Sequence, residues 1–174
     1  MNKYPWYTIV DSDEPLRQGD FINSCPVVIP HEPTIQGKNI EAEVKEYNVA
    51  IMSQSCDLEQ EKIDLVLVCP IWTLKELEEK SEFLKQKDGK EKLRKGNVLG
   101  YHLLNKCDLK GFNSFFLVVD FRSVYGVPFK FLSDLAKNNG KRLRLLPPYR
   151  EHLSQAFARF FMRVGLPIDI PAFK

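Results

Sequence analysis

The sequence predicts one β-rich domain that also contains helices and ends in an amphipathic helix. Short continuous apolar runs at residues 49–52, 63–68 and 115–120 are bounded by polar residues, a pattern typical of buried strands. A chain of 174 residues fits one domain, which we expect to span residues 1–174, with the strands within about 16–146.

The C-terminal helix is the clearest element of the sequence. It is expected over residues 149–164, after the stiff Pro147-Pro148 pair and before Gly165. Its apolar residues share one stripe at helical spacing: Leu153, Phe157, Phe160, Phe161 and Val164. Three phenylalanines are too much apolar surface to leave in water. We expect the stripe to pack on the strands of the same chain, the alternative being a groove of a second chain.

Two further strands complete the predicted sheet. One follows a turn at Gly19 and ends near Pro30, and the other covers residues 101–104. Residues 31–43 are polar and contain Pro and Gly, so a loop is expected there. The run 115–120 is the most apolar of the chain, which predicts a central position in the sheet.

Two shorter helices are expected within the domain. Leucines recur at helical spacing over residues 73–86, and Thr73 with Glu76 resembles a capping box, which predicts an inserted helix. The mixed-charge segment 87–97 predicts a mobile linker. Another helix is expected over residues 128–136, because proline suits the first turn of a helix.

The composition argues against several classes of protein. The net charge of +2 is too small to be an electrostatic footprint for nucleic acid by itself. No apolar run approaches the roughly 18 residues of a membrane span, and the start of the chain lacks a signal peptide. A cytoplasmic location with reduced cysteines and no membrane partner is therefore expected. The cysteines are scattered, and no acidic or histidine cluster has ligand spacing, so neither a metal nor a cofactor is expected.

Polar side chains directly follow the apolar run 49–52. Ser53 and Gln54 are candidate nucleic-acid-binding residues, because strand ends commonly present functional groups. The alternative is an ordinary turn in which short polar side chains satisfy backbone groups.

Cys56, in the same turn, is a candidate nucleophile. His102 would be its base and Asp120 the carboxylate that orients the base. The alternative is that Cys56 is a partly buried thiol and His102 an ordinary strand residue, since trios of this kind arise by chance in chains of this length.

Two pairs of charged residues are candidates for phosphate contact. Asp120 and Arg122 fall on one face of a strand, about 7 Å apart, where Arg would hold a phosphate and Asp position a hydroxyl. The alternative is a structural ion pair. Arg142 and Arg144 also share one face if their segment is a strand, which favours contact with the nucleic-acid backbone. The alternative is a solvent-facing edge strand guarded by basic residues.

Three stretches, in the same order along the chain, are similar to a known family. Residues 18–22 (QGDFI) look like a Gly-Asp opening of a first strand. Residues 49–54 and 66–73 look like paired core strands ending in a Pro-Ile-Thr-type turn, and residues 118–124 like a later strand with Asp, then Arg and a small hydroxyl residue. Together they resemble the MazF/PemK family of toxin ribonucleases.

The resemblance implies an SH3-like, PemK/MazF-type barrel, here with an inserted helix and a C-terminal helix. It also implies metal-independent cleavage of single-stranded RNA through the 2′-hydroxyl, in a bacterial toxin–antitoxin or phage-defence system. Thr73 and Arg122 match functional positions of the family. The chain departs from the pattern where Tyr47-Asn48 replaces the family's Arg-Pro pair and Val124 replaces an acid.

The sequence thus leaves three functions open. The first is RNA binding with endoribonuclease activity, favoured by the Asp120 and Arg122 pair. The second is a non-catalytic PemK-like module that acts through a protein partner or a homodimer, favoured by the missing Arg. The third is a hydrolase that uses Cys56 and His102.

Overall fold

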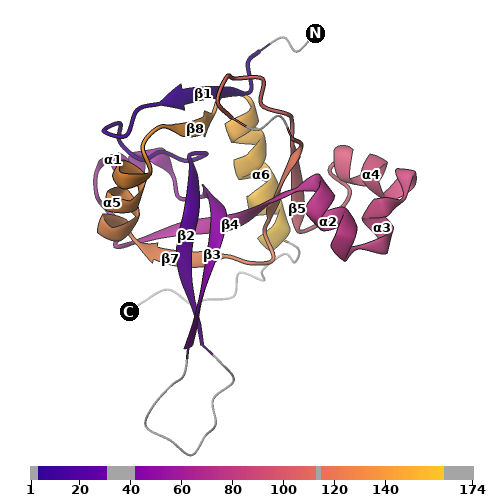
Figure 1. Ribbon diagram of the computed structural model, residues 1–174, viewed down its shortest axis with the longest axis horizontal. Helices are drawn as coiled ribbons and strands as arrows, with labels where there is room; N and C mark the ends of the chain where they lie inside the picture. The colour runs from indigo at the N-terminus through magenta and orange to yellow at the C-terminus, as the bar shows by residue number, and fades with distance from the viewer. Residues whose placement is uncertain (1–3, 31–41, 113–114, 163–174) are drawn as a thin grey trace, which may run out of the picture.

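The computed structural model describes residues 4–30, 42–112 and 115–162 (Figure 1). These residues form a mixed α/β fold whose strands all pair antiparallel. A two-stranded sheet pairs β1 (Tyr7–Val10) with β8 (Arg142–Leu145). The larger sheet has six strands, β2 (Phe21–Pro30), β3 (Ala42–Ile51), β4 (Leu65–Thr73), β6 (Leu117–Asp120), β5 (Tyr101–Leu104) and β7 (Tyr125–Pro128).

The long strand β4 holds the larger sheet together. Its residues 65–68 pair with β7, its residues 68–70 with β3, and its residues 71–73 with β6. A strand that changes partners along its length must twist and bend with the sheet around it. The strand expected at residues 63–68 is therefore the first half of a longer one. An isolated bridge between Asp20 and Arg144 joins the two sheets.

Two long helices cover the sheets. In α5 (Phe129–Asn139) the side chains of Leu132 and Ala136 are buried against apolar residues of β2, β3 and β4. In α6 (Tyr149–Phe161) Leu153 is fully buried and Phe157 packs edge-on against Phe121, with the ring centroids 5.4 Å apart. The structure thus confirms both helices and the packing of the C-terminal one on its own chain.

Three short helices form a lobe beside the sheet, seen at the right of Figure 1. They are α2 (Leu74–Lys80), α3 (Glu82–Lys85) and α4 (Lys87–Arg94). The capping box of Thr73 and Glu76 is present, as expected. The single helix expected over residues 73–86 is interrupted at Ser81, which has extended backbone angles.

The prediction of a linker at residues 87–97 is wrong, because most of this segment is helix α4. Leu93 is 2% exposed and anchors the helix to the lobe. Ion pairs at helical spacing, such as Lys92 with Asp88, lie on its outer side. The charge pattern read as a solvated linker is the outer face of an amphipathic helix.

Other expectations also need correction. Phe115 is 54% exposed and lies outside β6, so the buried strand starts two residues later than expected. Phe161 is 58% exposed, and Val164 lies outside the described residues. The strands β1 and β7 were not expected, and the polar turn after β3 leads into a short helix, α1 (Ser55–Glu59). Among the described helices none is both long and apolar enough to cross a membrane.

Candidate functional site

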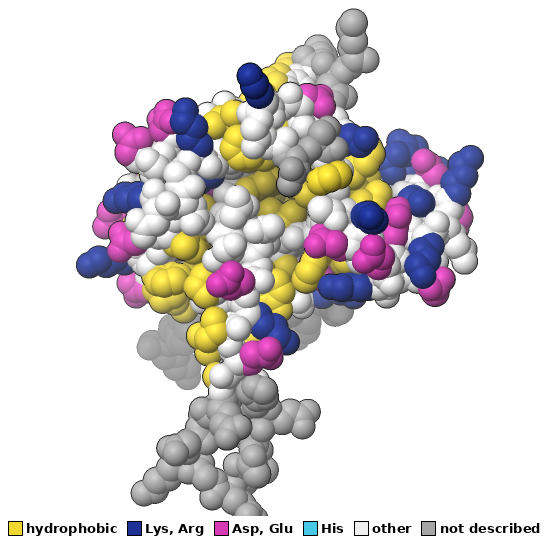
Figure 2. Space-filling view, in the orientation of Figure 1, with side chains coloured by type: hydrophobic (Ala, Val, Ile, Leu, Met, Phe, Trp, Pro, Cys, Tyr) yellow, Lys and Arg dark blue, Asp and Glu magenta, His cyan; other side chains and the backbone are white. Residues whose placement is uncertain are grey.

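A groove lies between the two sheets on the described surface. It has a volume of about 900 Å³. Figure 2 shows hydrophobic side chains gathered in a hollow on this face, with charged side chains around them. The groove is lined by residues in or next to β1, β2, β3, β4, α2, β6 and β8 and by the segment that joins β5 to β6: Ile9, Asp11, Phe21, Asn23, Tyr47, Asn48, Ile71, Trp72, Thr73, Glu76, Lys110, Gly111, Phe112, Phe115, Leu117, Lys141, Arg142 and Leu143.

Strand alternation explains why apolar and polar side chains meet here. Phe21 and Asn23 are two residues apart on β2 and therefore point to one face. Ile71 and Thr73 stand in the same relation on β4. Phe21 and Ile71 are buried and form the floor, whereas Asn23 is exposed at the surface.

Aromatic rings line the groove at two places. Tyr47 and Trp72 lie at one end, with their ring centroids 5.8 Å apart and their planes nearly perpendicular. Phe112 and Phe115 come from the segment before β6. Phe115 is the most exposed of these aromatic residues, at 54%. Exposed rings that face a groove are platforms on which planar ligands stack.

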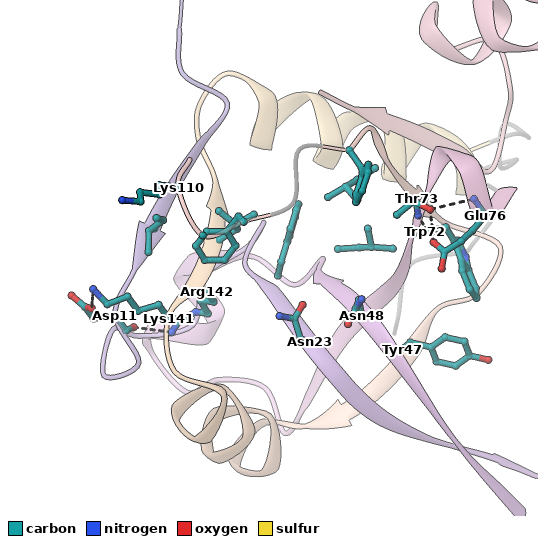
Figure 3. A pocket seen from close by; sticks show the side chains of 18 residues that line it. Asp11, Asn23, Tyr47, Asn48, Trp72, Thr73, Glu76, Lys110, Lys141 and Arg142 are labelled. Atoms are coloured by element: carbon teal, nitrogen blue, oxygen red, sulfur yellow. Dashed lines mark hydrogen bonds and ion pairs between the residues drawn. The ribbon is translucent and has the colours of Figure 1, made fainter. Parts of the chain in front are cut away.

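Two amides lie at the middle of the groove, side by side on neighbouring strands (Figure 3). The pairing of β2 with β3 is irregular between Ile22 and Cys25, and this shift brings Asn23 and Asn48 to the same opening. The backbone N–H of Ser24 donates to Oδ1 of Asn48 at 3.1 Å. The side-chain NH2 of Asn48 is therefore left as a donor toward a ligand.

The charges of the groove are few and of both signs. Lys141 pairs with Asp11 at 3.2 Å, and both lie at the end opposite Trp72 (Figure 3). Lys110 makes no ion pair with any described residue. The carboxylate of Glu76, at the end near Trp72, accepts a hydrogen bond from the Thr73 hydroxyl. The groove can therefore bind a ligand that offers rings and a small number of negative charges.

Thr73 is the candidate catalytic residue that lines the groove, but its hydroxyl is engaged. Its Oγ1 donates to Glu76 Oε2 at 2.7 Å and accepts the backbone N–H of Glu76 at 3.2 Å. The hydroxyl therefore caps helix α2, and the carboxylate oxygen that accepts its proton also accepts the backbone N–H of Thr73, at 2.6 Å.

Arg122 does not line the groove. Its Nε and Nη2 donate to the two carboxylate oxygens of Asp120 at 2.9 and 2.8 Å, and Nη2 also contacts the Tyr101 hydroxyl. This bidentate pair lies beside β5, with the guanidinium 4.2 Å from the centroid of the Tyr101 ring. Of the two interpretations of Asp120 and Arg122, the geometry matches the structural ion pair.

The cysteine trio is not assembled. Cys56 is exposed on α1, and its Sγ is 3.8 Å from a carboxylate oxygen of Asp57. His102 belongs to β5, on the opposite side of the molecule from α1 (Figure 1). Burial, and then the positive charges of nearby His152 and Arg159, lower the pKa of His102 to about 4. The Asp120 carboxylate is bound to Arg122 and makes no hydrogen bond to His102 in the described structure.

The polar turn after β3 has a structural role in the fold. Ser53 is buried and accepts the backbone N–H of Leu67 at 2.8 Å. Ser55 accepts the backbone N–H of Gln18 at 3.2 Å. Gln54 is exposed just before α1 and does not line the groove.

The expectation that Arg142 and Arg144 face solvent is wrong. They are 4% and 7% exposed, and both guanidinium groups donate to the carboxylate of fully buried Asp20. They also donate to the carbonyl of Pro15. Each arginine is thus held by a buried carboxylate, and neither is available to a phosphate.

Comparison with protein-family models, curated proteins and solved structures finds no match to this chain. Among the described residues no group of three His, Cys, Asp or Glu side chains could hold a metal ion. Sequence reasoning missed Asn23, Lys110 and the exposed phenylalanine Phe115. Nothing in their local sequence marks them, because distant segments bring them together.

Proposed function

We propose that the groove binds single-stranded RNA, with bases stacked on its aromatic rings. The observation that carries this proposal is the combination, in one groove, of the exposed ring of Phe115 and three partly buried aromatic rings with two amides and Lys110, which makes no ion pair with a described residue. Proteins recognise single-stranded RNA by stacking unpaired bases on aromatic side chains and by hydrogen bonds to the base edges. Phe115 is the stacking platform, and Asn48 donates its NH2 to a base.

The small charge of the groove determines the kind of binding. Of the lining cations Arg142 is buried, so only Lys110 and Lys141 can approach phosphates. Lys141 already forms an ion pair with Asp11. Binding therefore depends mainly on stacking. For single strands each neutralised phosphate contributes a slope of about −0.7 to the dependence of log K on log salt, so we expect a slope no steeper than about −1.4.

We further propose that the strands form an SH3-like barrel of the PemK/MazF type. The bent strand β4 supports this, because it pairs with three others and leads from Pro70-Ile71 to Thr73. The pair Tyr47-Asn48, which stands where the family has an arginine-proline pair, directly precedes Val49, the partner of Pro70, and lines the same groove as Thr73. The place of such a barrel in a toxin–antitoxin or phage-defence system stays a prediction.

The geometry favours a binding module over a nuclease. Thr73 is tied to Glu76, and Arg122 is tied to Asp120 away from the groove. We expect the protein to bind a labelled single-stranded RNA without shortening it, with and without chelator. Cleavage that is lost in Thr73→Val or Arg122→Ala would support the nuclease.

Binding is tested by fluorescence anisotropy with a labelled single-stranded RNA. Phe115→Ala should weaken binding by about 5- to 150-fold, because a stacked base is worth about 1–3 kcal/mol. Phe131→Ala is the matched control, since Phe131 is 45% exposed on α5 and does not line the groove. Equal affinities of the two variants, or equally tight binding of duplex RNA, would contradict the proposal.

A further inference from the structure

A second, smaller cleft lies between α6, the end of α4 and strand β5. Its volume is about 290 Å³, and it shares no lining residue with the groove. It is lined by Arg94, Lys95, Gly96, Val98, Leu99, Gly100, Tyr101, His102, Phe121, His152, Gln155, Ala156, Arg159 and Phe160. No carboxylate is among these residues, although acidic residues are 23 of the 174 in the chain. The lining therefore offers hydrogen-bond donors and positive charge and contributes no carboxylate of its own.

One face of α6 supplies the donors of the first wall. His152, Gln155 and Arg159 recur at helical spacing and therefore share one face. Their side-chain nitrogens make no hydrogen bond or ion pair with the described part of the chain. Groups of this kind satisfy their hydrogen-bonding capacity with water or a ligand.

The second wall comes from the end of helix α4. Arg94 is neutralised by Glu91, which it contacts through Nε and Nη2 and which does not line the cleft. Lys95 makes no ion pair with a described residue. Lys95, whose charge also acts on the nearby Glu91, and Arg159 are therefore the two cations of the lining that make no ion pair with a described residue.

The histidine of β5 that lines the cleft, His102, is partly buried and lies near its positive charges. His102 stacks near Phe121, with ring centroids 6.2 Å apart. After burial itself, the charges of His152 and Arg159 are the causes that lower the pKa of His102. An anion placed among these groups would meet attractive charge on two sides.

We propose that this cleft binds the phosphate group of a small phosphomonoester. Arg159 and Lys95 hold the phosphate oxygens, and Gln155 and His152 donate to the remaining ones. The rings of Tyr101 and Phe160 border the cleft and would contact the organic part of such a ligand. The cleft is independent of the groove, so this inference does not rest on RNA binding.

The test uses the full chain and three probes followed by amide NMR: inorganic phosphate, adenosine monophosphate and adenosine. We expect both phosphates to shift the amides of residues 94–102 and 152–160, and adenosine to leave them in place. Arg159→Gln should weaken phosphate binding by about tenfold or more, because a charge-assisted hydrogen bond is lost. Lys130→Gln, an exposed lysine on α5, is the charge-matched control and should leave the affinity unchanged.

Three results would overturn the proposal. Absence of shifts with both phosphates would show that no phosphate site exists. Equal weakening by Lys130→Gln and Arg159→Gln would show that only the net charge matters. Adenosine binding as tightly as its monophosphate would show that the cleft recognises the nucleoside and not the phosphate. None of these results depends on RNA binding at the groove, because the readout is confined to residues of the cleft.

Discussion

The guanidinium of Arg142 donates to the carboxylate of Asp20 at 2.8 Å, and neither side chain is more than 4% exposed. Arg144 completes the cluster from the same strand, so one carboxylate joins β8 to the start of β2. Further donors of the two arginines are used by backbone carbonyls of residues 11–15. Removing one member of this buried cluster should lower the stability of the fold strongly, because it leaves a buried charge without a partner.

Asp20→Asn should therefore lower the free energy of unfolding by about 3 kcal/mol or more, since two buried guanidinium groups would lose their counter-ion. Urea unfolding followed by tryptophan fluorescence measures the change. Asp13→Asn is the control, because Asp13 is exposed and makes no ion pair with a described residue. A loss below about 1 kcal/mol would show that the cluster contributes little.

Leu153→Ala should destabilise the fold by about 2–5 kcal/mol, because its side chain is fully buried between α6 and the sheets. Phe161→Ala on the same helix should change stability by less than about 0.5 kcal/mol, since Phe161 is 58% exposed. Thermal unfolding of both variants gives the comparison. If Phe161→Ala were the more damaging, the exposed end of α6 would have to be buried in an assembly.

Arg122→Ala separates the structural from the catalytic interpretation of this residue. The variant leaves the carboxylate of Asp120, 5% exposed as a residue, without its two strongest hydrogen bonds. We expect a loss of stability of about 1–2 kcal/mol with RNA affinity unchanged. Weaker RNA binding at unchanged stability would instead place Arg122 in the RNA site.

The pH dependence of stability should carry a contribution from His102. Its pKa is lowered from 6.5 to about 4 in the folded chain, so the unfolded chain binds the proton more tightly. The free energy of unfolding therefore falls as the pH drops from about 6.5 toward 4, by up to about 3 kcal/mol. Urea unfolding between these pH values should show a shallower slope in His102→Gln than in the original chain. Identical slopes would mean that His102 is accessible to water.

Local patterns in the sequence predicted the elements that depend on neighbouring residues. The capping box at Thr73, the apolar run of β3 and the stripe centred on Leu153 belong to this kind. Their signals are short-range, and burial of one face is enough to fix them.

The groove could not be predicted in the same way. Asn23, Trp72 and Lys141 are far apart in the sequence, and only the pairing of the strands brings them together. The burial of the two arginines of β8 could not be predicted for a related reason. Alternating charge and leucine predicts an edge strand with exposed arginines. In the fold both arginines are buried, because they donate to the carboxylate of Asp20, more than a hundred residues away.

The central claim, that single-stranded RNA lies in the groove, is tested most directly by photocrosslinking. A single-stranded RNA carrying photoreactive thiouridine is irradiated with the protein, and the crosslinked tryptic peptides are identified by mass spectrometry. The account predicts crosslinks in residues 46–62, 63–75 or 111–122, which contain Tyr47, Trp72 and the exposed phenylalanine of the groove. Crosslinks confined to residues 96–106 or 151–159, which border the second cleft, would contradict it.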